Sequence, residues 1–108
     1  MSNAERVLDA LGDATRRRVF KRLRSGSRSV QAIADGLDVS RPAVSQHLKI
    51  LKRAGLVVVR VEGTRRHYGV NARGIEALRT WLDGFWNETL AAFKEAAESE
   101  AVKARKRE

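Results

Sequence analysis

One helical segment in the middle of the chain carries side chains that could read nucleic-acid bases. Between residues 40 and 54, apolar side chains recur at i, i+3, i+4 and i+7, which predicts a helix with an inward face. That inward face consists of Val44, His47, Leu48 and Leu51. The opposite face is polar and basic, and it carries Arg41, Pro42, Ser45, Gln46 and Lys49. Because glutamine pairs with adenine, and arginine with guanine or a phosphate, Gln46 and Arg41 are candidates to contact bases.

The remaining positions of this segment suit supporting contacts with DNA. Ser45 fits a base edge or a phosphate, and Lys49, one turn farther along, is better placed for the backbone. Ser40 is the expected N-cap, and Pro42 lies in the first turn, where a missing N–H costs little. The positive helix N-terminus favours a phosphate, and Ala43 could touch a thymine methyl group. The alternative is a solvated polar face on a helix whose role is purely structural.

A basic hairpin is expected directly after this helix. The helix ends at Gly55, and residues 56–61 are nearly all β-branched, which predicts a strand. Residues 62–64 form a glycine-bearing turn, and residues 65–70 form the second strand. Four hairpin side chains are candidates to follow phosphates or enter a minor groove: Arg60, Thr64, Arg65 and Arg66. The alternative is that these arginines only keep an exposed hairpin edge soluble.

The upstream elements place the polar helix in a recognisable arrangement. A helix is expected over residues 13–24, capped by Asp13, and another over residues 29–37, capped by Ser29. A link of three residues then leads into the helix that begins after Ser40. Two helices joined by so short a turn suit a helix-turn-helix, whose second helix lies in the major groove of DNA.

A long final helix is expected from Ile75 onward. Its apolar face is wider than one stripe, and four of the six aromatic residues fall between residues 81 and 93. This is more apolar surface than a fold of 108 residues needs to cover, unless the aromatic side chains pack within the subunit. We expect one domain, mainly α with a small β-hairpin, over residues 1–97. The charged tail of residues 98–108 is expected to be frayed or disordered.

Positive charge is concentrated in the part of the chain that carries these candidates. The net charge is +9; residues 1–74 hold 16 Lys and Arg against 6 Asp and Glu, whereas residues 75–108 hold 6 against 7. A basic surface attracts a polyanion through counterion release, which favours nucleic acid. A membrane would need a basic amphipathic helix, but the apolar final helix is nearly neutral. With no signal-peptide region and no apolar stretch of ~18 residues, a cytoplasmic location is expected.

The polar helix and the hairpin also resemble a known family. The string SRPAVSQHLKILKRAGLV (40–57), followed by VEGTRRHYGV (61–70), is similar to the ArsR/SmtB family of bacterial winged-helix repressors. The string LGDATRRRVFKRL (11–23) is similar to the second helix of that family. The resemblance covers most of the chain and implies a winged helix-turn-helix of order ααααββα. It also implies a repressor that binds double-stranded DNA at a pseudo-palindromic operator and occludes a promoter.

The resemblance further implies a homodimer formed through the first and last helices. The candidate interface residues are Leu8, Leu11, Trp81, Leu82, Phe85, Trp86, Leu90 and Phe93. This agrees with the excess of apolar surface on the final helix. The identity of a small-molecule effector is left open.

Metal sensing, for which the family is best known, is not expected here. Such sensors use a cysteine pair on the third helix, or histidines and carboxylates on the last helix. The chain has no cysteine, the third helix reads SVQAIADGL (29–37), and the last helix has no histidine. His47 lies on an inward face, where a hydrogen-bonded structural role is expected, and His67 lies on the hairpin. We therefore expect no metal site and no cofactor.

The sequence also bears on three other classes of function. An enzyme is not expected, because the sequence has no phosphate-binding glycine loop, no nucleophile elbow and no zinc-protease motif. A non-specific architectural DNA-binding protein would need the basic residues but no base-reading face. A winged-helix module that binds other proteins would need neither. The last two alternatives remain open on the sequence alone.

Overall fold

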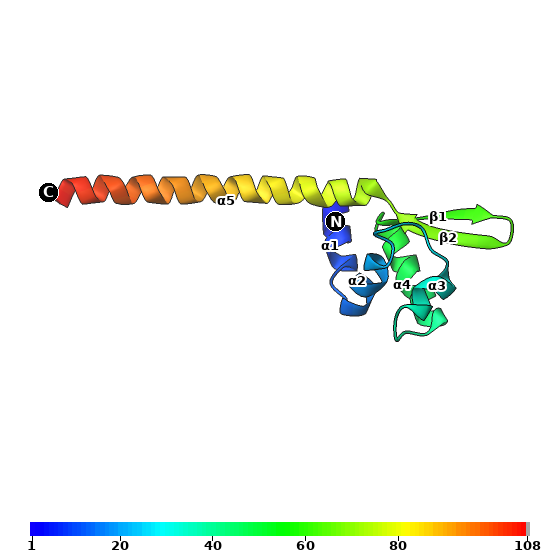
Figure 1. Cartoon of the computed structure of the whole chain (residues 1–108). Coiled ribbons are helices and arrows are strands. Elements are labelled where there is room, and N and C mark those ends of the chain that lie inside the picture. The colour runs from blue at the N-terminus through cyan, green and yellow to red at the C-terminus, as the bar shows by residue number, and fades with distance from the viewer. Residues whose placement is uncertain (108) are drawn as a thin grey trace. The chain divides into compact units, whose positions relative to one another are not determined.

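Six helices and strands precede one long helix in this computed structural model, which describes residues 1–107. The helices α1 (Asn3–Ala10), α2 (Ala14–Lys21), α3 (Val30–Asp35) and α4 (Arg41–Arg53) come first. The strands β1 (Val57–Glu62) and β2 (Arg65–Val70) follow, and α5 (Ala72–Arg107) ends the chain (Figure 1). This is the predicted order of a winged helix-turn-helix. The chain forms two compact units, Met1–Leu78 and the part of α5 from Arg79 onward.

Each of the four short helices begins at a side chain that caps it. The predicted caps Asp13, Ser29 and Ser40 accept hydrogen bonds from backbone N–H groups three residues ahead, at 2.8, 3.2 and 3.3 Å. Ser2 and Glu5 add a reciprocal capping box at the start of α1. Each cap satisfies a donor that the first turn of a helix otherwise leaves free, so these residues fix where the helices begin.

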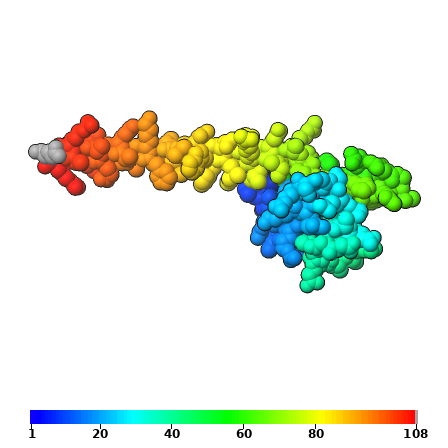
Figure 2. All heavy atoms as spheres, viewed as in Figure 1, coloured from blue at the N-terminus to red at the C-terminus, as the bar shows by residue number. Residues whose placement is uncertain are grey.

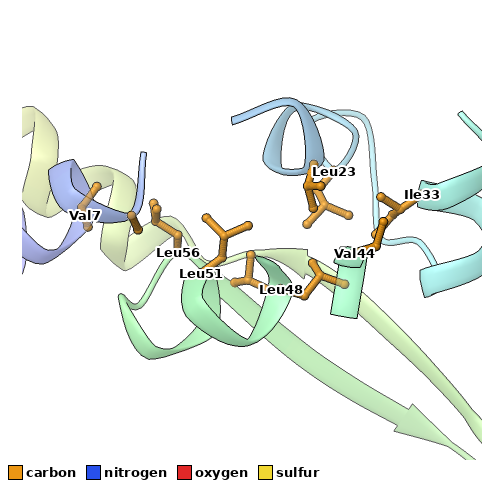
Figure 3. Packing of buried hydrophobic residues seen from close by; sticks show 10 residues of the cluster. Val7, Leu23, Ile33, Val44, Leu48, Leu51 and Leu56 are labelled. Atoms are coloured by element: carbon orange, nitrogen blue, oxygen red, sulfur yellow. The ribbon is translucent and has the colours of Figure 1, made fainter. Parts of the chain in front are cut away.

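The hydrophobic core is built around the inward face of α4. Val44, Leu48 and Leu51 are fully buried, as predicted. They join one cluster with Val19 of α2, Leu23 from the loop after it, Ile33 of α3 and residues from α1 and β1. Figure 3 shows Val44 close to Leu23 and Ile33, and Leu51 close to Leu56. The core therefore fixes which side of α4 can face a partner.

The hairpin has a regular register that closes over a two-residue loop. Val57 pairs with Val70 and Glu62 pairs with Arg65, which leaves Gly63 and Thr64 in the loop. Gly63 has a φ of +63°, as the first central residue of a type II′ turn requires. On the other side of β2, the backbone of Arg28 exchanges two hydrogen bonds with that of Tyr68, at 2.9 and 2.8 Å. The hairpin is thus tied to the loop between α2 and α3.

Three helices differ in length from the sequence expectation, and of these α3 ends at Asp35 and not at residue 37. The second helix ends at Lys21 and not at Arg24, because the chain tightens into turns with bonds to the residue three back, such as Leu23 N–H to Phe20 O at 3.0 Å. The final helix begins at Ala72, three residues before Ile75. There the side chain of Asn71 accepts a hydrogen bond from the backbone N–H of Arg73 at 3.1 Å.

The end of the chain also differs from the expectation. Residues 98–107, predicted to be frayed or disordered, continue α5 as a helix, while Glu108 lies outside the described residues. This stretch is rich in alanine, glutamate, lysine and arginine, which are strong helix formers. Its last turn holds Arg105, Lys106 and Arg107, whose charges favour a helix C-terminus. Within residues 1–107, no helix is both long and apolar enough to cross a membrane.

The role of the α4 core leads to a prediction about stability. Leu48→Ala should lower the free energy of unfolding by about 2–5 kcal/mol, because it leaves a cavity among fully buried side chains. Urea unfolding at a fixed protein concentration measures this change. Ile50→Ala, at a half-exposed position of the same helix, is the matched control and should cost ~1 kcal/mol or less. Equal losses in the two variants would contradict the assignment of the core.

Candidate DNA-binding surface

The outward face of α4 presents polar side chains to solvent. Arg41, Pro42, Ser45, Gln46 and Lys49 are all exposed. Two other candidates are less available: Ala43 is half-buried, and the hydroxyl of Ser40 is engaged as the N-cap, accepting from the N–H of Ala43. The exposed side chains thus offer a guanidinium, an amide and an ammonium group to a ligand. The N-terminus of α4 adds its positive end to the same region.

A cleft joins this face to the hairpin. It has a volume of about 510 Å³ and lies between α4 and one side of β1 and β2. The lining residues of this α4–wing cleft are Ser45, Leu48, Lys49, Lys52, Val59, Val61, Arg66 and Tyr68. The structure therefore brings together three predicted residues that are far apart in sequence, namely Ser45, Lys49 and Arg66. With three cations and an apolar floor, the cleft suits a phosphate backbone better than a neutral ligand.

Lys52 is a cleft residue that the sequence analysis missed. It lies three residues after Lys49, so at helical spacing both ammonium groups share one side of α4. The same i, i+3 rule that identified the inward residues could have identified it. Base contacts are expected from the first half of the helix, and the position of the hairpin, which brings the second half into the site, does not follow from the sequence.

The hairpin cations divide between its two faces. Residues directly opposite in an antiparallel pair share a face, and Val59 with Tyr68 and Val61 with Arg66 face the cleft. Arg60 and Arg65 belong to the other face, where Arg65 and Thr64 line a separate cavity of about 530 Å³ with the start of α3, and Arg66 borders this cavity as well as the cleft. Arg60 also forms an exposed ion pair with Glu62, N–O 3.3 Å. The predicted hairpin set therefore splits, and only Arg66 lies in the α4–wing cleft.

Several arginines upstream of α4 are committed to backbone carbonyls. Arg16 and Arg17 donate to Ala10 O and Leu11 O at the end of α1. Arg22 donates to Ala32 O at 3.2 Å, and Arg28 donates to Arg22 O at 2.8 Å. These guanidinium groups satisfy carbonyls that helix ends leave free. Their charges still attract a polyanion, but their donors serve the fold, which net charge alone did not reveal.

The two histidines do not form a metal site. His47 is half-buried on α4, and its Nδ1 is buried with no hydrogen-bond partner among residues 1–107, so the predicted hydrogen bond is not found. His67 lies on β2, in a different element. Across the described part of the chain, no three histidine, aspartate or glutamate side chains gather closely enough to hold a metal ion.

One carboxylate near His47 has a perturbed acidity. The pKa of Asp13 is lowered from its ordinary value, first because the carboxylate accepts the backbone N–H of Arg16, and further through the charges of Arg16 and His47. Asp13 is the N-cap of α2, so the ionised form is the one that stabilises the helix. His47, on the inward side of α4, thus lies near the start of α2.

The predicted interface residues on α5 are large and exposed. Trp81, Leu82, Phe85, Trp86, Leu90 and Phe93 are each between 40% and 66% exposed. The rings of Trp81 and Phe85 stack with centroids 5.8 Å apart. In the space-filling view these residues lie within the yellow and orange part of the surface (Figure 2). On α1, Leu8 is 38% exposed, whereas Leu11 packs partly against the core of its own unit.

Comparison with known proteins gives consistent matches. A family described as a helix-turn-helix domain matches residues 11–60. The HTH-type transcriptional regulator Rv2034 of Mycobacterium tuberculosis is 49% identical over 96 residues, which cover 89% of this chain and 90% of that protein. The transcriptional repressor SdpR of Bacillus subtilis is 30% identical over 82 residues, covering 76% of this chain and 91% of that protein.

Solved structures match the fold as well. One is the homodimeric winged helix-turn-helix DNA-binding domain of a possible ArsR-family transcriptional regulator from Mycobacterium bovis. It superposes with a TM-score of 0.64 and 32% identity, over 82% of this chain and 82% of that one. Structures of other ArsR-family regulators match too. The residues matched by the helix-turn-helix family, 11–60, include α4 and the first part of β1.

Gln46, a candidate base contact, and Arg66, a candidate backbone contact, should respond differently to substitution. Gln46→Ala should cost about 1–3 kcal/mol of binding free energy and relax the preference at one base position, because an amide pairs with a base edge. Arg66→Ala should weaken all sequences alike and lower the salt slope by about 1, because it removes a phosphate contact. Fluorescence anisotropy over a salt series, with variant DNA sequences, measures both effects.

The control for this pair is Lys94→Ala, which removes an exposed cation of α5 outside the surface. It should leave affinity and salt slope nearly unchanged. Identical behaviour of the Gln46 and Arg66 variants would contradict the division between reading and positioning residues.

Proposed function

The chain belongs to the ArsR/SmtB family of winged helix-turn-helix transcriptional regulators, and we propose that it is a dimeric repressor that occludes a promoter. As a member of this family it is a DNA-binding regulator and not an enzyme. The proposal adds three elements: sequence-specific contacts from α4, a homodimer, and repression. We place its action in the cytoplasm, where bacterial DNA lies.

The α4–wing cleft is the observation that carries this proposal. Gln46 and Arg41 stand exposed on α4 beside a cleft that contains Lys49, Lys52 and Arg66. None of these three cations has an ion-pair partner among residues 1–107. A phosphate seated in the cleft would fix α4 against the duplex, and the amide and guanidinium groups would then reach base edges. Reading and positioning contacts are thus combined on one surface.

A homodimer accounts for the apolar face of α5. Six large apolar residues that are 40–66% exposed on one helix form a patch of the kind that marks protein contacts. The similar domain from Mycobacterium bovis is described as homodimeric. A two-fold dimer presents two copies of α4, and it therefore selects half-sites related by the same symmetry. This supports a pseudo-palindromic operator.

Repression is supported by the similarity to SdpR, which is named as a transcriptional repressor. A dimer bound across two major grooves covers the DNA that a polymerase would need, so occupancy alone suffices to block transcription. The alternative, a non-specific architectural protein, would not require an exposed Gln46 on the outward face of α4. A release signal in this proposal is not a metal, because the residues do not fit one: there is no cysteine, and the two histidines belong to separate elements.

Specific recognition predicts a large preference for the protein's own regulatory DNA. At physiological salt, affinity for the DNA upstream of its gene should exceed affinity for random DNA of equal length by roughly 10³ or more. Competition binding with the two duplexes measures this ratio. A ratio near one would favour the architectural alternative, and failure to retain any DNA at ~50 mM salt would favour a protein-binding module instead.

The dimer proposal predicts the effect of a charge on α5. Trp86→Glu should shift the protein from dimer to monomer, because it places a carboxylate within the apolar face. Sedimentation velocity measures the change. Ala91→Glu is the matched control, since at about 3.6 residues per turn it lies on the opposite side of α5, and it should leave the dimer intact. An unchanged dimer in the Trp86 variant would rule out this interface.

A further inference from the structure

Another cavity, distinct from the one lined by Thr64 and Arg65, also lies away from the α4–wing cleft. It has a volume of about 560 Å³ and is formed by α2, the loop after it, the hairpin and the first turn of α5. Its apolar lining comes from Phe20, Leu23, Val58, Val70 and Ile75. The size falls within the range of roughly 300–1,000 Å³ that is usual for small-molecule sites. We refer to it as the α2–hairpin cavity.

Apolar side chains in this cavity remain open to solvent. Val58 is 48% exposed, and Val70 and Ile75 are also exposed, although all three belong to regular elements of the Met1–Leu78 unit. Two walls of the cavity, the loop after α2 and the strand β2, lie against each other. A Cβ atom at Gly69 would stand 2.6 Å from Ser27 Oγ, so the loop that bears Ser27 lies directly against the backbone of β2. The cavity is therefore a formed feature with an uncovered apolar surface.

Two cations stand at this apolar surface without partners. Lys21 and Arg24 line the cavity, and neither makes an ion pair or a side-chain hydrogen bond among the described residues. This distinguishes them from Arg16, Arg17 and Arg22 on the same segment, whose guanidinium groups bind backbone carbonyls. Apolar walls with two free cations are complementary to a ligand that has a hydrocarbon body and one anionic end.

Adjacent residues of β1 line the α2–hairpin cavity and the α4–wing cleft, so the strand links the two. Val58 and its partner Gly69 line the α2–hairpin cavity, whereas the next residue pair, Val59 and Tyr68, lines the α4–wing cleft. Alternating side chains on a strand point to opposite faces of the hairpin. A ligand that displaces Val58 therefore also displaces the strand that carries Val59, and with it one wall of the cleft.

We propose that the α2–hairpin cavity binds an amphipathic carboxylic acid, with its chain against Val58 and Ile75 and its carboxylate at Lys21 and Arg24. This ligand is the release signal of the regulator, a part of the inference that rests on the proposed function. Binding itself does not depend on DNA. The site therefore has a test that can be made on the protein alone.

Calorimetric titration of the full chain with decanoate, and with decanol as a neutral probe of equal chain length, tests the site. The protein should bind decanoate more tightly than decanol by about tenfold, because only the acid makes charge-assisted hydrogen bonds. The double variant Lys21→Ala/Arg24→Ala should lose this preference while still binding decanol. Val58→Glu should abolish binding of both probes. Arg18→Ala removes an exposed cation from α2 outside the cavity and should bind like the parent protein.

Four outcomes would overturn the proposal: no heat with decanoate, equal affinity for the two probes, equal losses in the Arg18 variant and the double variant, or undiminished binding by Val58→Glu. A fifth is a change in sedimentation caused by Val58→Glu, which would show that a second copy of the chain covers the cavity.

Decanoate should also release operator DNA from the parent protein but not from the double variant. Decanoate binding without any preference for operator DNA would reject the proposed function and leave the cavity assignment standing.

Discussion

Burial of one side of α4 is the constraint on which the rest of the molecule depends. Val44, Leu48 and Leu51 are fully enclosed by residues from α1, α2, α3 and β1, so α4 cannot rotate about its axis without opening the core. The opposite side, with Gln46 and Lys49, is thereby held outward. The core therefore determines which side chains a ligand can meet. One side of α4 therefore contributes to stability, and the opposite side is available for recognition.

Positive charge serves two purposes in this chain, and the structure separates them. Arg16, Arg17, Arg22 and Arg28 neutralise and cap helix ends by donating to carbonyl oxygens. Lys49, Lys52 and Arg66 converge on a cleft instead. Both groups raise the potential that a polyanion experiences at long range. Only the second group has hydrogen-bond donors available at short range. Net charge therefore bears on the long-range attraction of DNA, whereas the positions of these side chains bear on its binding.

Local signals in the sequence predicted the elements well, and tertiary contacts account for what it did not predict. Asp13, Ser29 and Ser40 cap the helices that were expected after them, because capping depends only on neighbouring residues. The role of Lys52 was missed because it requires the hairpin to fold back toward α4. The Nδ1 atom of half-buried His47 has no hydrogen-bond partner among residues 1–107, and a partner for an imidazole cannot be deduced from helical periodicity. The composition of residues 98–107 favours a helix, as observed. The expectation of a frayed tail rested on the charge of these residues and not on their helix propensity.

The strict alternation along β1 constrains how the wing can vary among related proteins. Val59 and Val61 face the α4–wing cleft, while Val58 faces the α2–hairpin cavity. Inserting or deleting one residue within the strand would exchange the two sets, and both surfaces would be lost in a single step. Changes of two residues would preserve them, as would changes confined to the loop at Gly63. Related hairpins that keep both surfaces should therefore differ in strand length by an even number of residues. An odd change would turn the side chains of each strand to the opposite face of the two-stranded sheet.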